Sequence, residues 1–153
     1  MEMESRQLAL LCRVQSRWCA LPIEHVVETM RPLPVESISG TPPFVIGLAV
    51  IRGAAVPVID VAVLLGGTRS VPTRFVTFKV GERRAALVVD AVVGVRSLEK
   101  ETLRDLPPLL QDAGGGAVES IGTFDAEILI VLRAIRLVPE TVWASLEQDG
   151  PLP

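Results

Sequence analysis

The chain alternates between apolar segments of strand length and short groups of turn residues. Four pairs of these segments predict β-hairpins, because two apolar runs joined by a few turn residues favour antiparallel pairing. The pairs are 8–14 with 17–23, 48–52 with 55–59, 74–80 with 83–92, and 118–124 with 127–134. A further strand is expected at 25–34, and another at 92–98 after a bend at Gly94. Nine or ten short strands with regularly spaced turns favour a barrel or a sandwich.

Helical patterns are few in this sequence. Residues 135–148 predict a C-terminal helix with Pro139 near its first turn, since apolar side chains from Leu137 to Leu146 can share one face. Asp60 precedes the run VAVLL and is expected to cap one or two helical turns. The pair Pro42–Pro43 favours another helical turn over Phe44–Gly47.

One charged side chain interrupts the apolar segment VIRGAAVPVID at 50–60. Arg52 stands beside Gly53, the expected turn of the second hairpin, so it either reaches water or is held there to meet a partner. Pro57 cannot donate to a strand ladder, and its strand is therefore expected at a sheet edge or beside a bulge.

Composition narrows the class of protein. The chain has 153 residues, of which 49% are hydrophobic, which suits one domain or two small subdomains around one core. No apolar run reaches the roughly 18 residues that span a bilayer, and the polar start at 1–7 is not a signal peptide. A cytoplasmic protein without membrane insertion is therefore expected. The net charge of −3, with 4% aromatic residues and no basic stripe, argues against nucleic-acid binding.

Residues with catalytic or metal-binding chemistry are sparse. Cys12 and Cys19 lie in strand segments without a further ligand at metal spacing, and they are expected to be free, buried thiols. His25 is the only histidine, and Glu28 alone does not complete a metal site with it. These residues indicate a binding module without a metal or a cofactor rather than an enzyme.

Four segments in order carry a family resemblance: RWCALPIEHVVETM, TPPFVIGLAVIRGAAVPVIDV, AALVVDAVVGV and SIGTFDAEILIVLRAIRLV. Together they resemble the CheW-like domain, a family that couples chemoreceptors to the histidine kinase CheA. The second segment is the most specific, because family members carry Pro-x-Phe-hydrophobic-x-Gly, then Asn-Leu-Arg-Gly, where this chain has Val50 in place of the Asn, then Val-Pro-hydrophobic-hydrophobic-Asp-Leu. The resemblance covers about residues 8–147.

The resemblance implies a mainly β fold of two intertwined five-stranded SH3-like β-barrels with a C-terminal helix. Residues 8–147 would form a single CheW-like domain, with a linker between the barrels near 63–73. Residues 1–7 and 148–153 are expected to be flexible tails.

The resemblance also implies a non-enzymatic adaptor that couples the tips of methyl-accepting chemoreceptors to a CheA-type kinase in cytoplasmic arrays. Carried over by motif, the receptor-binding residues are Val26, Glu28, Ile51, Arg52 and Arg74. An apolar groove suits a helical receptor tip, and Arg52 either meets a receptor carboxylate or pairs with Glu28. No residue is assigned to kinase binding.

Two alternatives remain open from the sequence. Val50, Thr29 and Arg74 depart from the family pattern at positions on the binding surface. They are compatible with a divergent accessory protein of a gliding- or twitching-motility pathway, which would bind a receptor or another CheW-like adaptor but not the kinase. A small-molecule-binding barrel or enzyme has less support, namely the apolar interior and two strand-end carboxylates, Asp60 and Asp90.

Overall fold

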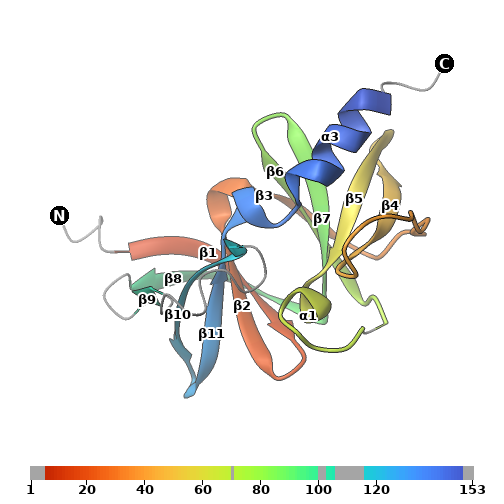
Figure 1. Cartoon of the computed structure of the whole chain (residues 1–153). Helices are drawn as coiled ribbons and strands as arrows, with labels where there is room; N and C mark the ends of the chain where they lie inside the picture. The colour runs from red at the N-terminus through yellow and green to blue at the C-terminus, as the bar shows by residue number, and fades with distance from the viewer. Residues whose placement is uncertain (1–5, 70, 100–102, 106–115, 150–153) are drawn as a thin grey trace.

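The computed structural model describes residues 6–69, 71–99, 103–105 and 116–149 (Figure 1). The chain is mainly β, as predicted. Its strands are β1 (Arg6–Val14), β2 (Arg17–Pro22), β3 (Val26–Met30), β4 (Val45–Ile51), β5 (Ala54–Asp60), β6 (Arg74–Val80), β7 (Arg83–Val89), β8 (Ala91–Glu99), β9 (Arg104–Asp105), β10 (Val118–Phe124) and β11 (Glu127–Leu132). Its helical elements are α1 (Val61–Leu64), α3 (Glu140–Asp149) and the 3-10 turns η2 (Ile23–His25) and η5 (Ala134–Arg136).

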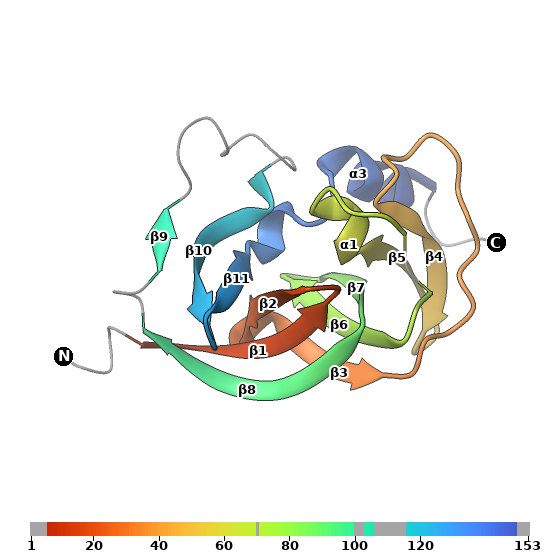
Figure 2. The ribbon, with the colours of Figure 1, turned by 90° about the horizontal axis from the view of Figure 1, so that it is seen from below.

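The described strands form two sheets. Sheet A has the order β8-β1-β2-β11-β10-β9, and sheet B has the order β3-β6-β7-β5-β4. All of the pairs are antiparallel except β2 with β11 and β5 with β7. Sheet A takes strands from both ends of the chain, whereas sheet B comes from the continuous stretch between them (Figure 2). The predicted fold class is confirmed, and the two-residue β9 is a sixth strand of sheet A.

The connections differ in part from expectation. The chain passes between the sheets at η2 and again from β7 to β8. Residues 63–73 do not join two barrels, because β5 before them and β6 after them both belong to sheet B. Residues 6–7 and 148–149 were expected in the flexible tails, but they belong to β1 and α3. The rest of both expected tails, 1–5 and 150–153, lies outside the described residues.

All four predicted hairpins are present, and each has a two-residue turn whose first residue adopts a left-handed backbone. The φ angles are 54° at Gln15, 53° at Arg52, 62° at Gly81 and 50° at Asp125. Such turns match the twist of the paired strands, which explains why hairpins with short polar or glycine-containing loops were readable from the sequence. The helical turn expected over Phe44–Gly47 is wrong, because β4 already begins at Val45.

Of the two alternatives expected for Pro57, the structure excludes the sheet edge and agrees with the bulge, because the register of β4 with β5 shifts between Val45 and Gly47, next to the Leu48–Pro57 pair. Its strand β5 lies between β7 and β4 and is not at an edge. Pro57 is opposite Leu48 of β4, while the pairing with β7 involves only Val58, Ile59 and Asp60. The missing N–H of Pro57 therefore falls outside the ladder with β7, and a proline is tolerated in a central strand.

One hydrophobic core is shared by the two sheets and the C-terminal helix. It contains Leu21 and Leu132 from sheet A, Phe78 and Leu87 from sheet B, and Val142 from α3, all buried. Because side chains of both sheets pack into the same cluster, the sheets are held as one unit.

Asp60 caps α1, as predicted. Its Oδ1 accepts hydrogen bonds from the backbone N–H groups of Ala62 at 3.0 Å and Val63 at 3.4 Å, and the side chain is buried in the core.

Replacing Asp60 with alanine is expected to lower the free energy of unfolding by about 1–2 kcal/mol, because two backbone donors lose their acceptor. Urea denaturation measures this change. Asp60→Asn keeps an acceptor oxygen and is the matched control. An alanine variant as stable as the parent would show that the cap contributes nothing.

Candidate functional site

Arg52 and Glu28 form a forked ion pair at the surface of sheet B. Arg52 Nη2 donates to Glu28 Oε1 at 2.8 Å, and Arg52 Nε donates to Glu28 Oε2 at 3.1 Å. The Arg52 side chain is 69% exposed and that of Glu28 is 28% exposed. The hydrogen bond from Arg52, assisted by its charge, holds the pKa of Glu28 below its ordinary value. The sequence left open whether Arg52 would pair with Glu28, and the structure shows that it does.

The pair joins strands from opposite edges of the same sheet. Glu28 lies on β3 and Arg52 follows β4, and these two strands are the outermost strands of sheet B. A contact of 2.8 Å between them requires the sheet to curl until its edges meet, as the neighbouring ends of β3 and β4 in Figure 2 illustrate. An exposed ion pair adds little stability by itself. Its effect is to hold the Arg52 guanidinium at one place on the surface.

The backbone of Arg52 is unusual for its residue type. Its φ of 53° and the φ of 80° at Gly53 place both turn residues in the left-handed region. Glycine and asparagine adopt this conformation at low cost, whereas arginine does so rarely. Unfavourable backbone conformations of this kind cluster at binding and catalytic sites. The turn therefore displays Arg52 at an energetic cost.

The other residues expected at the site are only partly brought together. Val26 is half-buried against the shared core, and Ile51 is only 6% exposed and lies in the core of sheet B. Ile51 therefore supports the turn from below. Arg74 is exposed at the start of β6, three positions from Thr77, which is opposite Glu28.

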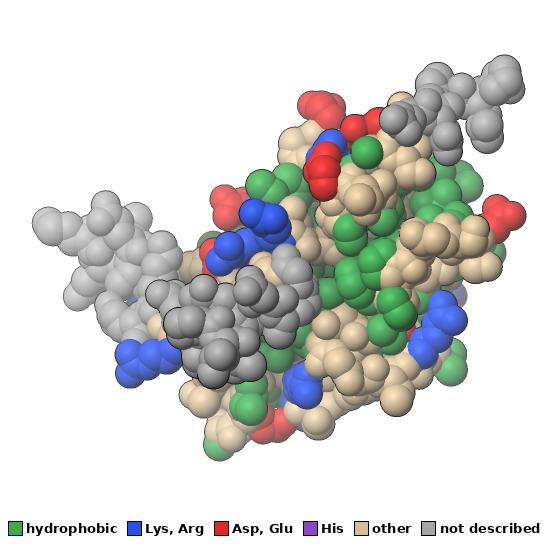
Figure 3. All heavy atoms as spheres, in the orientation of Figure 1, with side chains coloured by type: hydrophobic (Ala, Val, Ile, Leu, Met, Phe, Trp, Pro, Cys, Tyr) green, Lys and Arg blue, Asp and Glu red, His purple; other side chains and the backbone are tan. Residues whose placement is uncertain are grey.

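Two exposed apolar side chains lie near this pair, Val50, which the sequence placed on the binding surface, and Val27, which the sequence did not single out. Val50, two residues before Arg52, is 69% exposed, and Val27 extends outward at a bulge in β3. The irregular register between Val26 and Glu28 turns Val27 to the outside. Apart from this pair, Figure 3 shows hydrophobic side chains gathered on the face between α3 and α1, with charged side chains around them. Apolar surface of this kind, rimmed by polar groups, is typical of protein–protein contacts.

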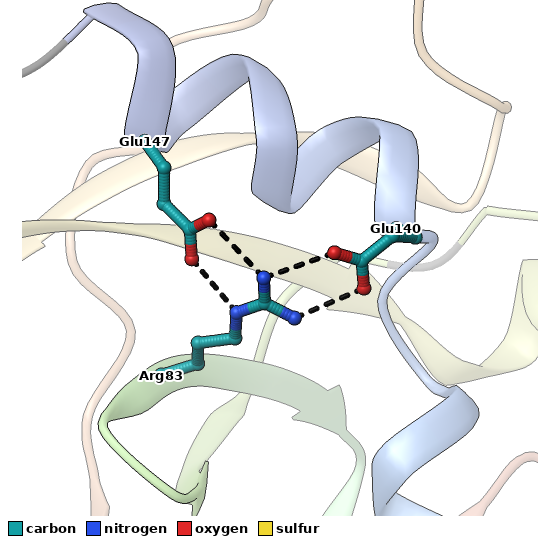
Figure 4. A network of polar contacts seen from close by, with 3 residues as sticks. All are labelled: Arg83, Glu140 and Glu147. Atoms are coloured by element: carbon teal, nitrogen blue, oxygen red, sulfur yellow. Dashed lines mark hydrogen bonds and ion pairs between the residues drawn. The ribbon is translucent and has the colours of Figure 1, made fainter.

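A second ion network fastens the C-terminal helix to sheet B (Figure 4). The guanidinium of Arg83 donates to both oxygens of Glu140, each at 2.9 Å, and to both oxygens of Glu147, at 2.7 and 3.1 Å. It also lies over the ring of Trp143, 5.4 Å from the centroid. The two carboxylates are seven residues apart on one helix face. The seven-residue spacing of the two glutamates can be seen in the sequence, but their shared partner, Arg83 on β7, cannot.

This Arg83 network borders a groove beside Arg52. The groove has a volume of about 440 Å³ and lies between the β4–β5 hairpin and α3. Arg52 and Ala55 line one side, and Trp143 and Leu146 line the other. The position of α3 therefore sets the width of the surface next to the Glu28–Arg52 pair.

The Arg83 network is expected to make the docking of α3 sensitive to acid. Hydrogen bonds from Arg83 lower the pKa of Glu147. A carboxylate with a lowered pKa stabilises the folded state above the ordinary glutamate pKa of about 4.3, and this contribution disappears as the pH falls through the lowered value. The thermal midpoint of the parent should therefore exceed that of Arg83→Gln at neutral pH, and the difference should shrink as the pH falls from about 5 towards 3.

Arg133→Gln, at another exposed arginine, is the control for this experiment. A difference between the parent and Arg83→Gln that stays constant over the same pH range would contradict the assigned role of Glu147.

The cysteines and aspartates considered for catalysis are either buried or hydrogen-bonded to the backbone. Cys12 and Cys19 are opposite each other on β1 and β2, and burial raises the pKa of each thiol to about 12. They stay protonated at neutral pH, which makes them poor nucleophiles. Asp60 caps α1, whereas Asp90 accepts a hydrogen bond from the N–H of Gln15 at 2.6 Å. Among the described residues, no group of three or more His, Cys, Asp or Glu side chains could hold a metal ion.

The fold and the exposed Glu28–Arg52 pair beside Val27 and Val50 are typical of a β-sheet module that binds other proteins through its surface. A family model described as "CheW-like domain" matches residues 8–142. The chain therefore belongs to the CheW-like domain family, whose members are chemotaxis scaffold and adaptor proteins and not enzymes. No helix in the described part of the chain is long and apolar enough to cross a membrane.

Individual relatives agree with this assignment. The chain is 25% identical over 132 residues to a probable chemotaxis protein CheW of Rhizobium etli, covering 84% of this chain and 85% of the relative. It is 31% identical over 121 residues to Protein FrzA of Myxococcus xanthus, covering 74% and 75%. The crystal structure of the scaffolding protein TtCheW from Thermoanaerobacter tengcongensis has a TM-score of 0.70 and 24% identity, covering 83% of this chain and 88% of that one.

Proposed function

We propose that this chain couples the cytoplasmic tips of methyl-accepting chemoreceptors to a CheA-type histidine kinase within receptor clusters in the cytoplasm. The observation that carries the proposal is the Glu28–Arg52 fork, which presents an exposed guanidinium from a strained turn beside apolar surface. The receptor surface comprises Val26, Glu28 and Arg52, with Ile51 beneath the turn and Arg74 at its margin.

The hydrogen bonding of Arg52 leaves it able to bind a partner. A guanidinium has five N–H donors. Glu28 accepts from Nε and Nη2, so both hydrogens of Nη1 and one of Nη2 remain for a receptor carboxylate or amide oxygen. Exposed Val27 and Val50 offer apolar contacts to the helices of a receptor tip. The site thus combines one directional polar group with apolar area.

A surface at the end of sheet A is available for the kinase. Arg13 lies over the ring of Trp18 at 4.4 Å, and Trp18 packs edge-to-face on Phe124. Nη1 of Arg13 and Nε1 of Trp18 are buried without a hydrogen-bond partner among the described residues, and Ile128 next to them in β11 is 59% exposed. Because these two donors are buried, the part of this surface that is open to a partner is apolar, and exposed apolar surface favours docking of another β domain.

The test is binding of the purified chain to a receptor signalling domain and, separately, to the CheW-like regulatory domain of the kinase, followed by kinase activity in the reconstituted ternary mixture. We expect both partners to bind and kinase activity to rise. Failure to bind either partner would refute the proposal.

A second function is favoured by one observation. Val50, which replaces the usual Asn of the family, is strongly exposed next to the site. This substitution fits an accessory adaptor of a motility pathway that binds a receptor or another CheW-like adaptor but not the kinase. Receptor binding without kinase binding would support this alternative, and robust kinase activation would eliminate it.

A further inference from the structure

A large groove lies apart from the Glu28–Arg52 pair and shares no lining residue with it. We call it the proline groove, and its volume is about 860 Å³. One wall is the connection from β3 to β4, and the other is the connection that leads into β6. The residues that define it here are Pro32, Leu33, Pro34, Ile46, Val71 and Pro72.

The surface of the proline groove is apolar and open. Val71 is 83% exposed, whereas valine is among the residue types that are most often buried. Pro32, Pro34 and Pro72 present apolar rings and have no backbone N–H. Grooves with such walls serve as docking sites for extended peptides, whose side chains alternate between the two sides of the backbone.

The rim of the proline groove is positively charged. Arg69 lines it, Arg31 precedes Pro32, and Arg74 lies two residues after Pro72. Met30 is opposite Phe75 in the pairing of β3 with β6, so the same register brings Arg31 next to Arg74.

These three arginines are not neutralised by the described part of the chain. The ion pairs there involve Arg13, His25, Arg52 and Arg83 instead. No aspartate or glutamate is found among the residues that line the groove. Like charges on adjacent strands repel each other, and a partner with carboxylates would relieve this repulsion.

We propose that the proline groove binds an extended acidic segment of a partner protein, in which carboxylates alternate with apolar side chains. The apolar side chains would lie on the prolines and Val71, and the carboxylates would meet Arg31, Arg69 and Arg74. Electrostatic complementarity of this kind selects the partner and speeds association. This surface shares only Arg74, at its rim, with the margin of the proposed receptor surface, and it shares no residue with the proposed kinase surface.

The experiment uses two fluorescein-labelled ten-residue peptides, one alternating Glu with Leu and the other alternating Lys with Leu. Fluorescence anisotropy with the whole chain should show saturable binding of the Glu–Leu peptide only. Raising the salt from 0.05 to about 0.5 M should weaken it, because the Debye length shrinks severalfold. Double charge reversal, Arg31→Glu with Arg69→Glu, should reduce the affinity at least tenfold, and Val71→Ser should also reduce it.

Arg136→Glu reverses an exposed arginine of η5 and should leave the peptide affinity unchanged. Circular dichroism checks that each variant is folded. Absence of binding, equal binding of the Lys–Leu peptide, or unchanged affinity in the folded double variant would each overturn the proposal. Self-association of the parent that the double variant abolishes would assign the groove to a second copy of the chain and would also overturn it.

The two binding proposals are distinguished by the same variants. Arg31→Glu with Arg69→Glu should leave the affinity for the receptor signalling domain unchanged, and Arg52→Glu should leave the affinity for the Glu–Leu peptide unchanged. If the chain binds the Glu–Leu peptide but no receptor signalling domain, the proposed receptor function fails and the proposal for the proline groove stands.

Discussion

Replacing Arg52 with glutamate is expected to weaken binding of the receptor signalling domain roughly tenfold to a hundredfold, while kinase binding stays unchanged. The substitution removes the exposed donors and places a second carboxylate beside Glu28, where the fork now joins the edges of sheet B. Both effects act at the same surface. Biolayer interferometry with each partner separately measures the two affinities.

A charge swap separates the two possible contributions of Arg52. In the double variant Glu28→Arg with Arg52→Glu, an ion pair can form again in the opposite direction. If Arg52 acts by holding the two edges of sheet B together, receptor affinity should recover. If its free donors contact the receptor directly, the affinity should stay low. Arg136→Glu is the control for a change of surface charge, and an Arg52→Glu variant with unaltered affinity for both partners would remove Arg52 from the site.

Replacing Gly47 with alanine is expected to produce the largest loss of stability, about 3 kcal/mol or more. Gly47 is buried at the irregular register of β4 with β5 and has a φ of 149°, a conformation that side chains rarely adopt. A Cβ there would collide with the carbonyl oxygen of Glu36, with the Glu36 carbonyl carbon at 2.7 Å and Val35 Cγ1 at 2.9 Å. The backbone of this connection cannot move away without losing the bridge between Glu36 and Leu48.

Gly40→Ala is the matched control for this substitution. Gly40 has a φ of 83°, but no atom lies within 4 Å of the position of an added Cβ. Only the backbone penalty of about 1 kcal/mol should therefore apply. Denaturation in urea compares the two variants. Equal losses at the two positions would show that the contact with Glu36 is relieved at little cost.

The hairpins were predictable because their information is local. Two apolar runs and a short turn specify antiparallel pairing within about 20 residues, and Arg52 at such a turn followed from the neighbouring Gly53. Which hairpins share a sheet depends on contacts between distant parts of the chain. The place of β5 between β7 and β4, and hence the surroundings of Pro57, was hidden for that reason.

The candidate site was predictable to the extent that a family motif marks it. Glu28 and Arg52 were both singled out, yet their meeting depends on the curl of sheet B, which no local pattern encodes. Ile51 was counted as a surface residue because an apolar side chain at a strand end can face either way. The proline groove was missed because its two walls come from separate connections that only the fold brings together.

The order of strands in sheet A has a consequence for synthesis of the chain. β1 and β2 leave the ribosome before the other described strands, but the parallel partner of β2 is β11, the last of them. Sheet B, made from the stretch between β3 and β7, can pair completely while β11 is still to come. Until then one edge of β2 is unpaired, and an unpaired strand edge invites association with other chains. Formation of sheet B therefore does not complete the protection of the nascent chain, because the edge of β2 stays open to other chains until β11 emerges.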